Sequence, residues 1–105
     1  MIKNFILKKG DELSFKITFV NEVTINSMEF GVKKDYTDEE FVILKTIGNG
    51  ITKLDSKNYQ VIVSSSEMET LDILSYVYDI RIRSGSMIRT PLSGKVIIKE
   101  TVFNG

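Results

Sequence analysis

Apolar and polar residues alternate along most of the chain, and this period of two constrains the fold more than any other feature. Residues two apart lie on the same face of a β-strand, so an alternating segment buries one face and exposes the other. In residues 12–19, four apolar residues alternate with four polar ones, which predicts a strand. Further buried faces are predicted at Met28, Phe30 and Val32; at Tyr59, Val61 and Val63; at Tyr76, Tyr78, Ile80 and Ile82; and at Ile88, Thr90, Leu92, Gly94, Val96 and Ile98.

Short clusters rich in Gly, Asn, Asp and Ser separate these segments, and such residues favour tight turns. The clusters are Lys9-Gly10-Asp11, Asn21-Glu22, Gly48-Asn49-Gly50, Asp55-Ser56-Lys57-Asn58 and Ser84-Gly85-Ser86. Asn49-Gly50 predicts a hairpin between strands at residues 41–46 and 51–54. Pro91 has no N–H to donate to a sheet ladder, which predicts a sheet edge or a bulge at that point.

Seven or eight short strands without crossover helices predict an all-β fold, and the 105 residues form one domain, residues 1–105. The fold we expect is an immunoglobulin-like antiparallel β-sandwich, with a small β-barrel as the alternative. The segment Leu74-Ser75-Tyr76-Val77-Tyr78 favours the sandwich, because a tyrosine at the start of a late strand can bond back to the preceding corner.

Two acidic segments fit the capping box of a helix N-terminus, Thr37-Asp38-Glu39-Glu40 and Ser66-Glu67-Met68-Glu69. Each predicts one helical turn. Together with Asp35, the first segment offers oxygens that a hard cation such as Ca²⁺ could use. The spacing matches no EF-hand, however, and acidic residues are typical of a first helical turn, so no metal site is predicted.

The composition excludes several classes of function. Cysteine and histidine are absent, so the chain cannot form disulfides, Cys- or His-ligated metal sites or a Ser-His-Asp triad. Fourteen basic residues balance fourteen acidic ones, which argues against nucleic acid or a membrane as a partner. The apolar run at the start is too short for a signal peptide or a membrane-spanning helix. We therefore expect a non-enzymatic protein without cofactors, made in the cytoplasm.

All three arginines of the chain, Arg81, Arg83 and Arg89, flank the turn at Ser84-Gly85-Ser86. A three-residue loop there would place Arg81 opposite Arg89. Opposed like charges destabilise a sheet, so Asp79 nearby, an acidic neighbouring strand, or a partner's carboxylates or phosphates should offset them. The three arginines are therefore candidate partner-binding residues, with compensation inside the chain as the alternative.

Apolar residues at outward positions are the other candidates for association. Ile62, Val77 and Ile97 occupy such positions. If Val77 and Ile97 share one sheet face, they form a patch suited to binding, so both join the candidate partner-binding residues. Tyr36 and Tyr59 could contact a sugar ring, but packing in the core or in a loop is the favoured interpretation of each.

The order of motifs over residues 5–102 resembles a known family. The motifs are Lys8-Lys9-Gly10-Asp11-Glu12-Leu13-Ser14-Phe15, Phe30-Gly31-Val32-Lys33-Lys34-Asp35-Tyr36-Thr37-Asp38, Gly50-Ile51-Thr52, Tyr59-Gln60-Val61-Ile62-Val63, Tyr76-Val77-Tyr78-Asp79-Ile80 and Thr90-Pro91-Leu92-Ser93-Gly94-Lys95-Val96. In this order they are similar to the amino-terminal domain of phage upper baseplate proteins and to small prophage structural proteins.

This resemblance implies a virion structural protein, a β-sandwich module that binds other phage tail or baseplate proteins or further copies of itself. Larger members of the family continue with portions that dock receptor-binding proteins, whereas this sequence ends soon after the β-rich region. A compact accessory or assembly module is therefore expected. The alternative function is a carbohydrate- or adhesin-like binding module on the same fold. An enzyme that relies on carboxylates and lysines comes third.

Overall fold

A computed structural model describes residues 1–21 and 24–103, and within them the protein is all-β except for one helical turn. The elements in chain order are β1 (Phe5–Lys8), β2 (Leu13–Thr18), β3 (Ser27–Lys33), β4 (Ile43–Ile47), β5 (Gly50–Lys53), β6 (Asn58–Val63), α1 (Ser65–Met68), β7 (Ser75–Ser84) and β8 (Met87–Lys99). Glu22, in the predicted turn Asn21-Glu22, lies outside the described residues. No helix in the described part of the chain is long and apolar enough to cross a membrane.

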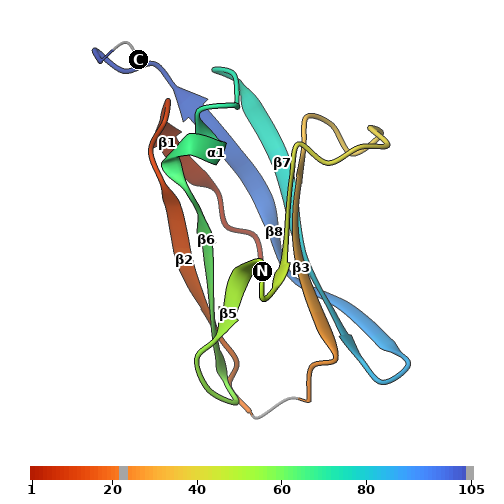
Figure 1. The fold of residues 1–105 in the computed structure, drawn as a ribbon. Helices are drawn as coiled ribbons and strands as arrows, with labels where there is room; N and C mark the ends of the chain where they lie inside the picture. Colours follow the sequence, from red (N-terminus) through yellow and green to blue (C-terminus); the bar gives the residue numbers. More distant parts are fainter. Residues whose placement is uncertain (22–23, 104–105) are drawn as a thin grey trace.

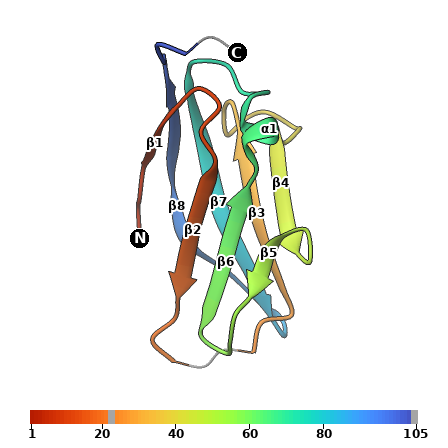
Figure 2. The same cartoon turned by 60° about the vertical axis from the view of Figure 1, so that its left-hand side comes forward.

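Hydrogen bonds join all eight described strands into one sheet, in the order β1-β8-β7-β3-β4-β5-β6-β2. The sheet bends near β4 and β5, so that β5, β6 and β2 lie across the core from β3, β7 and β8 (Figures 1 and 2). The two terminal strands of the sheet also approach each other, because the ring centroids of Phe5 and Phe15 are 4.7 Å apart. The predicted all-β class is confirmed, in the form of a nearly closed, barrel-like sheet.

Two strand pairs in the described chain run parallel, where the sequence predicted only antiparallel pairs. β1 runs parallel to β8, with Phe5 opposite Val96, and β4 forms a short parallel bridge to β5, with Thr46 opposite Gly50. The other five pairings are antiparallel. β1 has only four residues, too few for an alternating pattern to predict. A parallel pair is possible here because β1 and β8 are remote in sequence, so no tight turn has to join them.

Gly48-Asn49-Gly50 forms a corner and not the predicted hairpin. The N–H of Asn49 donates to the carbonyl of Thr46, and the N–H of Gly48 donates to the carbonyl of Ile51, both at 2.9 Å. Gly48 and Gly50 have φ of 89° and 94°, a backbone conformation that glycine adopts readily. The chain then leaves β4 and pairs as β5 with β6. The turn predicted from the glycines is confirmed, but the antiparallel direction predicted for the chain beyond it was wrong.

The core contains the side chains that the alternation predicted, except at one end of β8. Buried apolar residues are Leu13, Ile17, Met28, Phe30, Val32, Ile43, Ile51, Tyr59, Val61, Val63, Met68, Leu71, Tyr76, Tyr78, Ile80, Ile82, Leu92, Val96 and Ile98. Ile88 and Thr90 are exposed, contrary to prediction. The register of β8 against β7 shifts between Arg89 and Leu92, which leaves Thr90 and Pro91 in a bulge. This confirms the bulge predicted at Pro91, and it moves the preceding residues off the buried face.

Two buried tyrosines bind backbone groups through their hydroxyls. The hydroxyl of Tyr76 accepts a hydrogen bond from the N–H of Asp72 at 2.8 Å, which confirms the predicted bond back to the preceding corner. The hydroxyl of Tyr78 donates to the carbonyl of Lys3 at 2.6 Å. Burial raises the pKa of Tyr78 to about 12, so this hydroxyl remains a donor at neutral pH. The N-terminal segment is thereby attached to the centre of the sheet.

Of the two predicted helical turns, only one is present in the described residues. α1 starts two residues earlier than expected, because Ser64 is the N-cap and its hydroxyl accepts the N–H of Glu67 at 3.3 Å. Residues 37–40 form no helix. There the carboxylate of Asp35 accepts the N–H of Thr37 at 3.2 Å, which is an Asx-turn. The acidic residues of this segment therefore belong to a loop.

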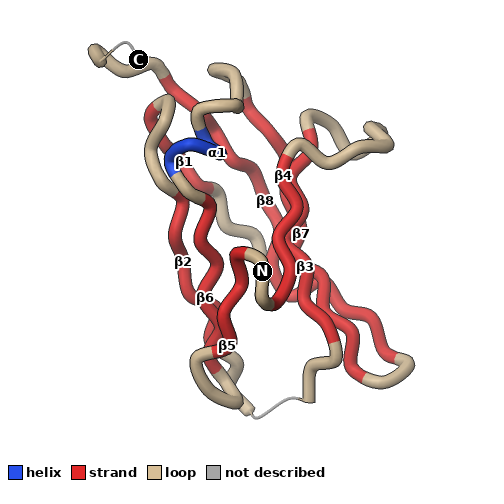
Figure 3. The backbone as a smooth tube through the Cα atoms, in the orientation of Figure 1, coloured by secondary structure: helices blue, strands red, loops and turns tan. Residues whose placement is uncertain are grey.

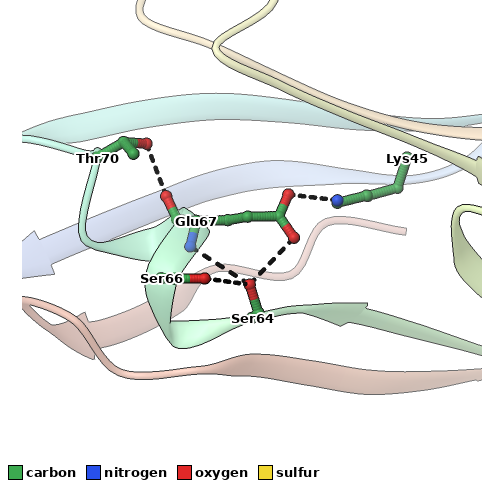
Figure 4. A network of polar contacts seen from close by, with 5 residues as sticks. All are labelled: Lys45, Ser64, Ser66, Glu67 and Thr70. Atoms are coloured by element: carbon green, nitrogen blue, oxygen red, sulfur yellow. Dashed lines mark hydrogen bonds and ion pairs between the residues drawn. The ribbon is translucent and has the colours of Figure 1, made fainter.

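A polar network ties α1 to β4 (Figure 4). Lys45 is 8% exposed, and its ammonium forms an ion pair with the carboxylate of Glu67. Ser64 donates to the same carboxylate at 3.1 Å, and the carbonyl of Glu67 accepts from the hydroxyl of Thr70 at 2.6 Å. The hydrogen bond from Lys45 is the largest of the effects that lower the pKa of Glu67, and the hydrogen bonds from Ser64 add to it. The network links β4 to the helical turn that follows β6, a strand with which β4 shares no ladder.

We expect Glu67→Gln to lower the free energy of unfolding by about 1 kcal/mol at neutral pH, a modest loss because solvent screens a half-exposed carboxylate. The folded-state pKa of Glu67 is lowered, so its contribution is present above the unfolded pKa of glutamate and disappears as the pH falls through the folded pKa. Urea unfolding of both proteins from neutral to acidic pH measures this difference. Glu12→Gln, on an exposed glutamate, is the control. A difference that persists in acid would contradict the expectation.

Candidate functional site

A groove lies on the outer face of the sheet, where β4, β3 and β7 are neighbours. Its volume is about 190 Å³. Its lining consists of Glu29, Gly31 and Lys33 from β3, Tyr36 and Phe41 from the β3–β4 loop, Leu44 from β4, Val77, Tyr78, Asp79 and Arg81 from β7, and Thr90 from β8. We term it the outer-face groove. The β3–β4 loop and the β7–β8 hairpin, which extend from the sheet on the same side in Figure 3, both contribute to it.

Gly31 leaves room for the ring of Phe41 on the outer face. It lies between Leu44 on β4 and Asp79 on β7, at a position that has no side chain. The ring of Phe41 occupies the space next to it, since a Cβ on residue 31 would lie 2.4 Å from a carbon of that ring. Any larger residue at position 31 would therefore have to displace Phe41 from the groove.

Aromatic side chains of the β3–β4 loop form one wall of the groove. Tyr36 is 62% exposed and Phe41 is 47% exposed. Lys33 holds this loop, because its ammonium lies 4.7 Å from the ring centroid of Phe41 and donates to the carbonyl of Asp38 at 2.7 Å. Of the two roles favoured from sequence, core and loop packing, Tyr36 has a place in a loop, where it is exposed and lines the groove, whereas Tyr59 is buried in the core.

Arg81 has a partner for its charge within the described chain, and the carboxylate of Asp79 does not. Arg81 donates to the carboxylate of Glu29 on the neighbouring strand at 3.0 Å, so its charge is offset within the chain. Asp79 has no ion pair or hydrogen-bond partner for its carboxylate among the described residues. Burial raises the pKa of Asp79, as expected for a carboxylate that loses hydration without gaining a cation. The groove therefore presents one carboxylate that these residues leave without a partner, opposite Gly31 in the ladder.

The structure separates the three candidate arginines. The β7–β8 loop contains two residues instead of three, and Ile82 lies opposite Arg89. The prediction that Arg81 faces Arg89 was therefore wrong. Directly opposed residues project to the same face, so Arg89 shares the face of Ile82, whereas Arg81 and Arg83 alternate onto the outer face. The two-residue loop is the physical cause, because it pairs Ser84 with Met87 and therefore Ile82 with Arg89, and the bulge at Thr90 and Pro91 comes only after these pairs.

Val77 and Ile97 meet on the outer face, as the patch hypothesis required. Ile97 lies opposite Ser75 and Val77 lies opposite Lys95, which makes Val77 and Ile97 diagonal neighbours. On the far side of Ile97 is Ile6 of β1, which is 64% exposed. Ile6, Ile97 and Val77 form what we term the outer apolar row. Val77 also lines the groove, so the row and the groove are continuous.

Sequence reasoning missed three important residues of the groove, Gly31, Phe41 and Asp79. A glycine among the outward positions of β3 was a visible signal of a gap in the sheet face. Phe41 was assigned to a strand, although β4 begins at Ile43. Asp79 was expected to offset the arginines, but Glu29 pairs with Arg81, and the position of Asp79 opposite Gly31 requires the β3–β7 register.

Comparison with known proteins supports the fold and does not extend to the site. No protein-family model matches the chain, and no curated protein matches it. Among solved structures, the endo-beta-1,4-mannanase from Thermotoga petrophila is similar over 90% of this chain, with a TM-score of 0.59 and 9% sequence identity. The chain spans 18% of the length of that mannanase. At this identity the likeness concerns the fold alone.

Proposed function

We propose that the protein is a non-enzymatic interaction module that binds other proteins through the outer face of its sheet. The observation that carries this proposal is the outer apolar row, Ile6, Val77 and Ile97. Each of these side chains keeps solvent contact on a face that no described helix covers (Figure 2). Adjacent apolar side chains exposed on one face are typical of association surfaces. The exposed Arg83 and Ile88 at the tip of the β7–β8 hairpin extend the surface.

We further propose that this module belongs to a phage or prophage virion, in the tail or baseplate. The resemblance of the motif order to the amino-terminal domain of phage upper baseplate proteins supports this setting. Many copies held in one particle raise the effective concentration of each contact, so a small surface on a 105-residue module is sufficient. The partners would be other tail or baseplate proteins, or further copies of this chain.

Mass spectrometry of phage particles purified from an induced culture of the source strain tests the virion assignment. We expect the chain at a fixed copy number beside tail proteins. Its absence from particles, combined with its presence in the cell lysate, would overturn the assignment to the virion. The proposed outer-face association would then be tested separately in solution.

Val77→Asp and Ile97→Asp are expected to weaken association by about tenfold each, because a charge placed in an apolar contact must be desolvated. Ile62→Asp is the matched control, since Ile62 is exposed at 39% but lies on β6, away from the row. Sedimentation over a concentration series, and binding to tail proteins from purified particles, provide the measurement. Equal effects of all three substitutions would contradict a role for the outer apolar row.

Arg81→Ser and Arg89→Ser test the arginine hypothesis. Arg81 lies on the outer face, where it pairs with Glu29, whereas Arg89 projects to the opposite face together with Ile82. We therefore expect Arg81→Ser to reduce partner binding more than Arg89→Ser does. Unchanged affinity in both variants would remove the arginines from the proposed interface.

For the fold, we propose the immunoglobulin-like sandwich as the finer class of the nearly closed sheet. Two features support this proposal. The hydroxyl of Tyr76 accepts a bond from the corner before its strand, as in sandwiches of this type. β4 and β5 share only two residue pairs, which suits a boundary between two layers.

A further inference from the structure

We propose that the outer-face groove binds one neutral pyranose ring of a glycan, a ligand function that goes beyond protein association. The groove combines an aromatic wall, an unpaired carboxylate at its floor and a guanidinium at its edge. A pyranose ring offers the complementary chemistry, an apolar face of C–H groups and a rim of hydroxyls that donate and accept hydrogen bonds.

The aromatic wall matches the apolar face of a sugar. Tyr36 and Phe41 come from one loop and keep 62% and 47% of their surfaces exposed. Stacking of an aromatic ring on the apolar face of a sugar is favourable, because water is released from both surfaces. The wall is already in place, because Lys33 contacts the Phe41 ring and binds the Asp38 carbonyl. A preformed wall reduces the entropy lost on binding.

The polar lining matches the hydroxyls. The carboxylate of Asp79 accepts two or more hydrogen bonds and has no donor among the described residues. Arg81 uses one nitrogen for Glu29, which leaves other N–H groups of the guanidinium free to donate to a ligand. The hydroxyl of Thr90 can donate or accept. Donor and acceptor groups therefore lie in the groove together with the aromatic wall.

Size and charge exclude other small ligands. The volume of about 190 Å³ is below the range of about 300–1,000 Å³ that holds drug-sized molecules, so one ring fits better than an extended ligand. An anion would face the carboxylates of Glu29 and Asp79, and Glu29 already offsets the charge of Arg81. No group of three or more acidic side chains in the described residues is placed to hold a metal ion.

NMR titration of the ¹⁵N-labelled protein tests the proposal directly. The probes are methyl glycosides of mannose, glucose, galactose and N-acetylglucosamine, followed by short oligosaccharides of the best one. We expect saturable amide shifts confined to the groove, at Gly31, Phe41 and Asp79, with dissociation constants on the order of millimolar, as suits a small open site.

Two variants locate the interaction. Tyr36→Ala and Asp79→Asn are each expected to weaken sugar binding by about tenfold, because the first removes a stacking ring and the second a charged acceptor. Both side chains are exposed, so the fold should persist. Phe103→Ala and Glu100→Gln remove an exposed aromatic ring and an exposed carboxylate outside the groove, and they should bind like the wild type.

A cationic probe separates this proposal from the nearest competing ligand class. n-Butylammonium chloride would pair with Asp79 and would lose affinity as salt is added, whereas sugar binding should depend little on salt. Groove shifts with n-butylammonium but with none of the glycosides would overturn the proposal in favour of a cation. Absence of groove shifts with every probe, or equal weakening by the control variants, would also overturn it.

Discussion

Replacing Gly94 with alanine is expected to lower the free energy of unfolding by at least about 3 kcal/mol. A Cβ at this position would lie 2.1 Å from the carbonyl oxygen of Lys3, and that oxygen accepts the hydrogen bond of the buried Tyr78 hydroxyl. The oxygen belongs to the backbone and cannot rotate away. The φ of Gly94 is 154°, which adds backbone strain for any other residue. The N-terminal segment would therefore have to leave the sheet.

Equilibrium unfolding in urea measures the loss, and limited trypsin digestion detects release of the N-terminal segment. Gly48→Ala is the matched control, because Gly48 also has a positive φ, of 89°, but a Cβ there meets nothing within 4 Å. We expect the control to show the backbone strain alone, about 1 kcal/mol. Equal losses in the two variants would show that the close approach to Lys3 does not matter.

Most of the fold was predictable because alternation reports directly which side chains are buried. β3, β6 and β7 bury the residues expected of them, and Pro91 correctly predicted the bulge in β8. What could not be predicted depends on contacts remote in sequence. The parallel pairing of β1 with β8 joins segments at opposite ends of the chain, and no local pattern encodes it. The direction of the chain after Gly48-Asn49-Gly50 likewise depends on β6, which supplies the partner strand.

The candidate site was predictable only in part, because it depends on register. The alternation placed Val77, Ile97 and Arg81 at outward positions, and the structure places them there. A turn loop one residue shorter than expected changes the register by one residue, which was enough to move Arg89 away from Arg81. The groove itself requires Gly31 to lie opposite Asp79, a relation between two strands that are far apart in sequence.

Phe30→Ala is expected to destabilise the protein by about 3–5 kcal/mol, a large part of the about 5–15 kcal/mol of a typical domain. Phe30 is fully buried, and its ring centroid lies 5.5 Å from those of Phe15 on β2 and Tyr78 on β7. It therefore joins strands that lie on opposite sides of the core. Urea unfolding gives the change in free energy, and Phe30→Leu, which leaves a smaller cavity, should lose less.

Phe41→Ala provides the contrast that separates stability from function. Phe41 is 47% exposed, so its removal should cost about half of what Phe30→Ala costs. The two phenylalanines lie on opposite sides of the same sheet, one facing the core and one lining the outer-face groove. If Phe41→Ala abolishes sugar-induced shifts while the protein stays folded, the groove is a binding feature that the fold does not need. A loss of stability as large as that of Phe30→Ala would instead make the aromatic wall part of the core.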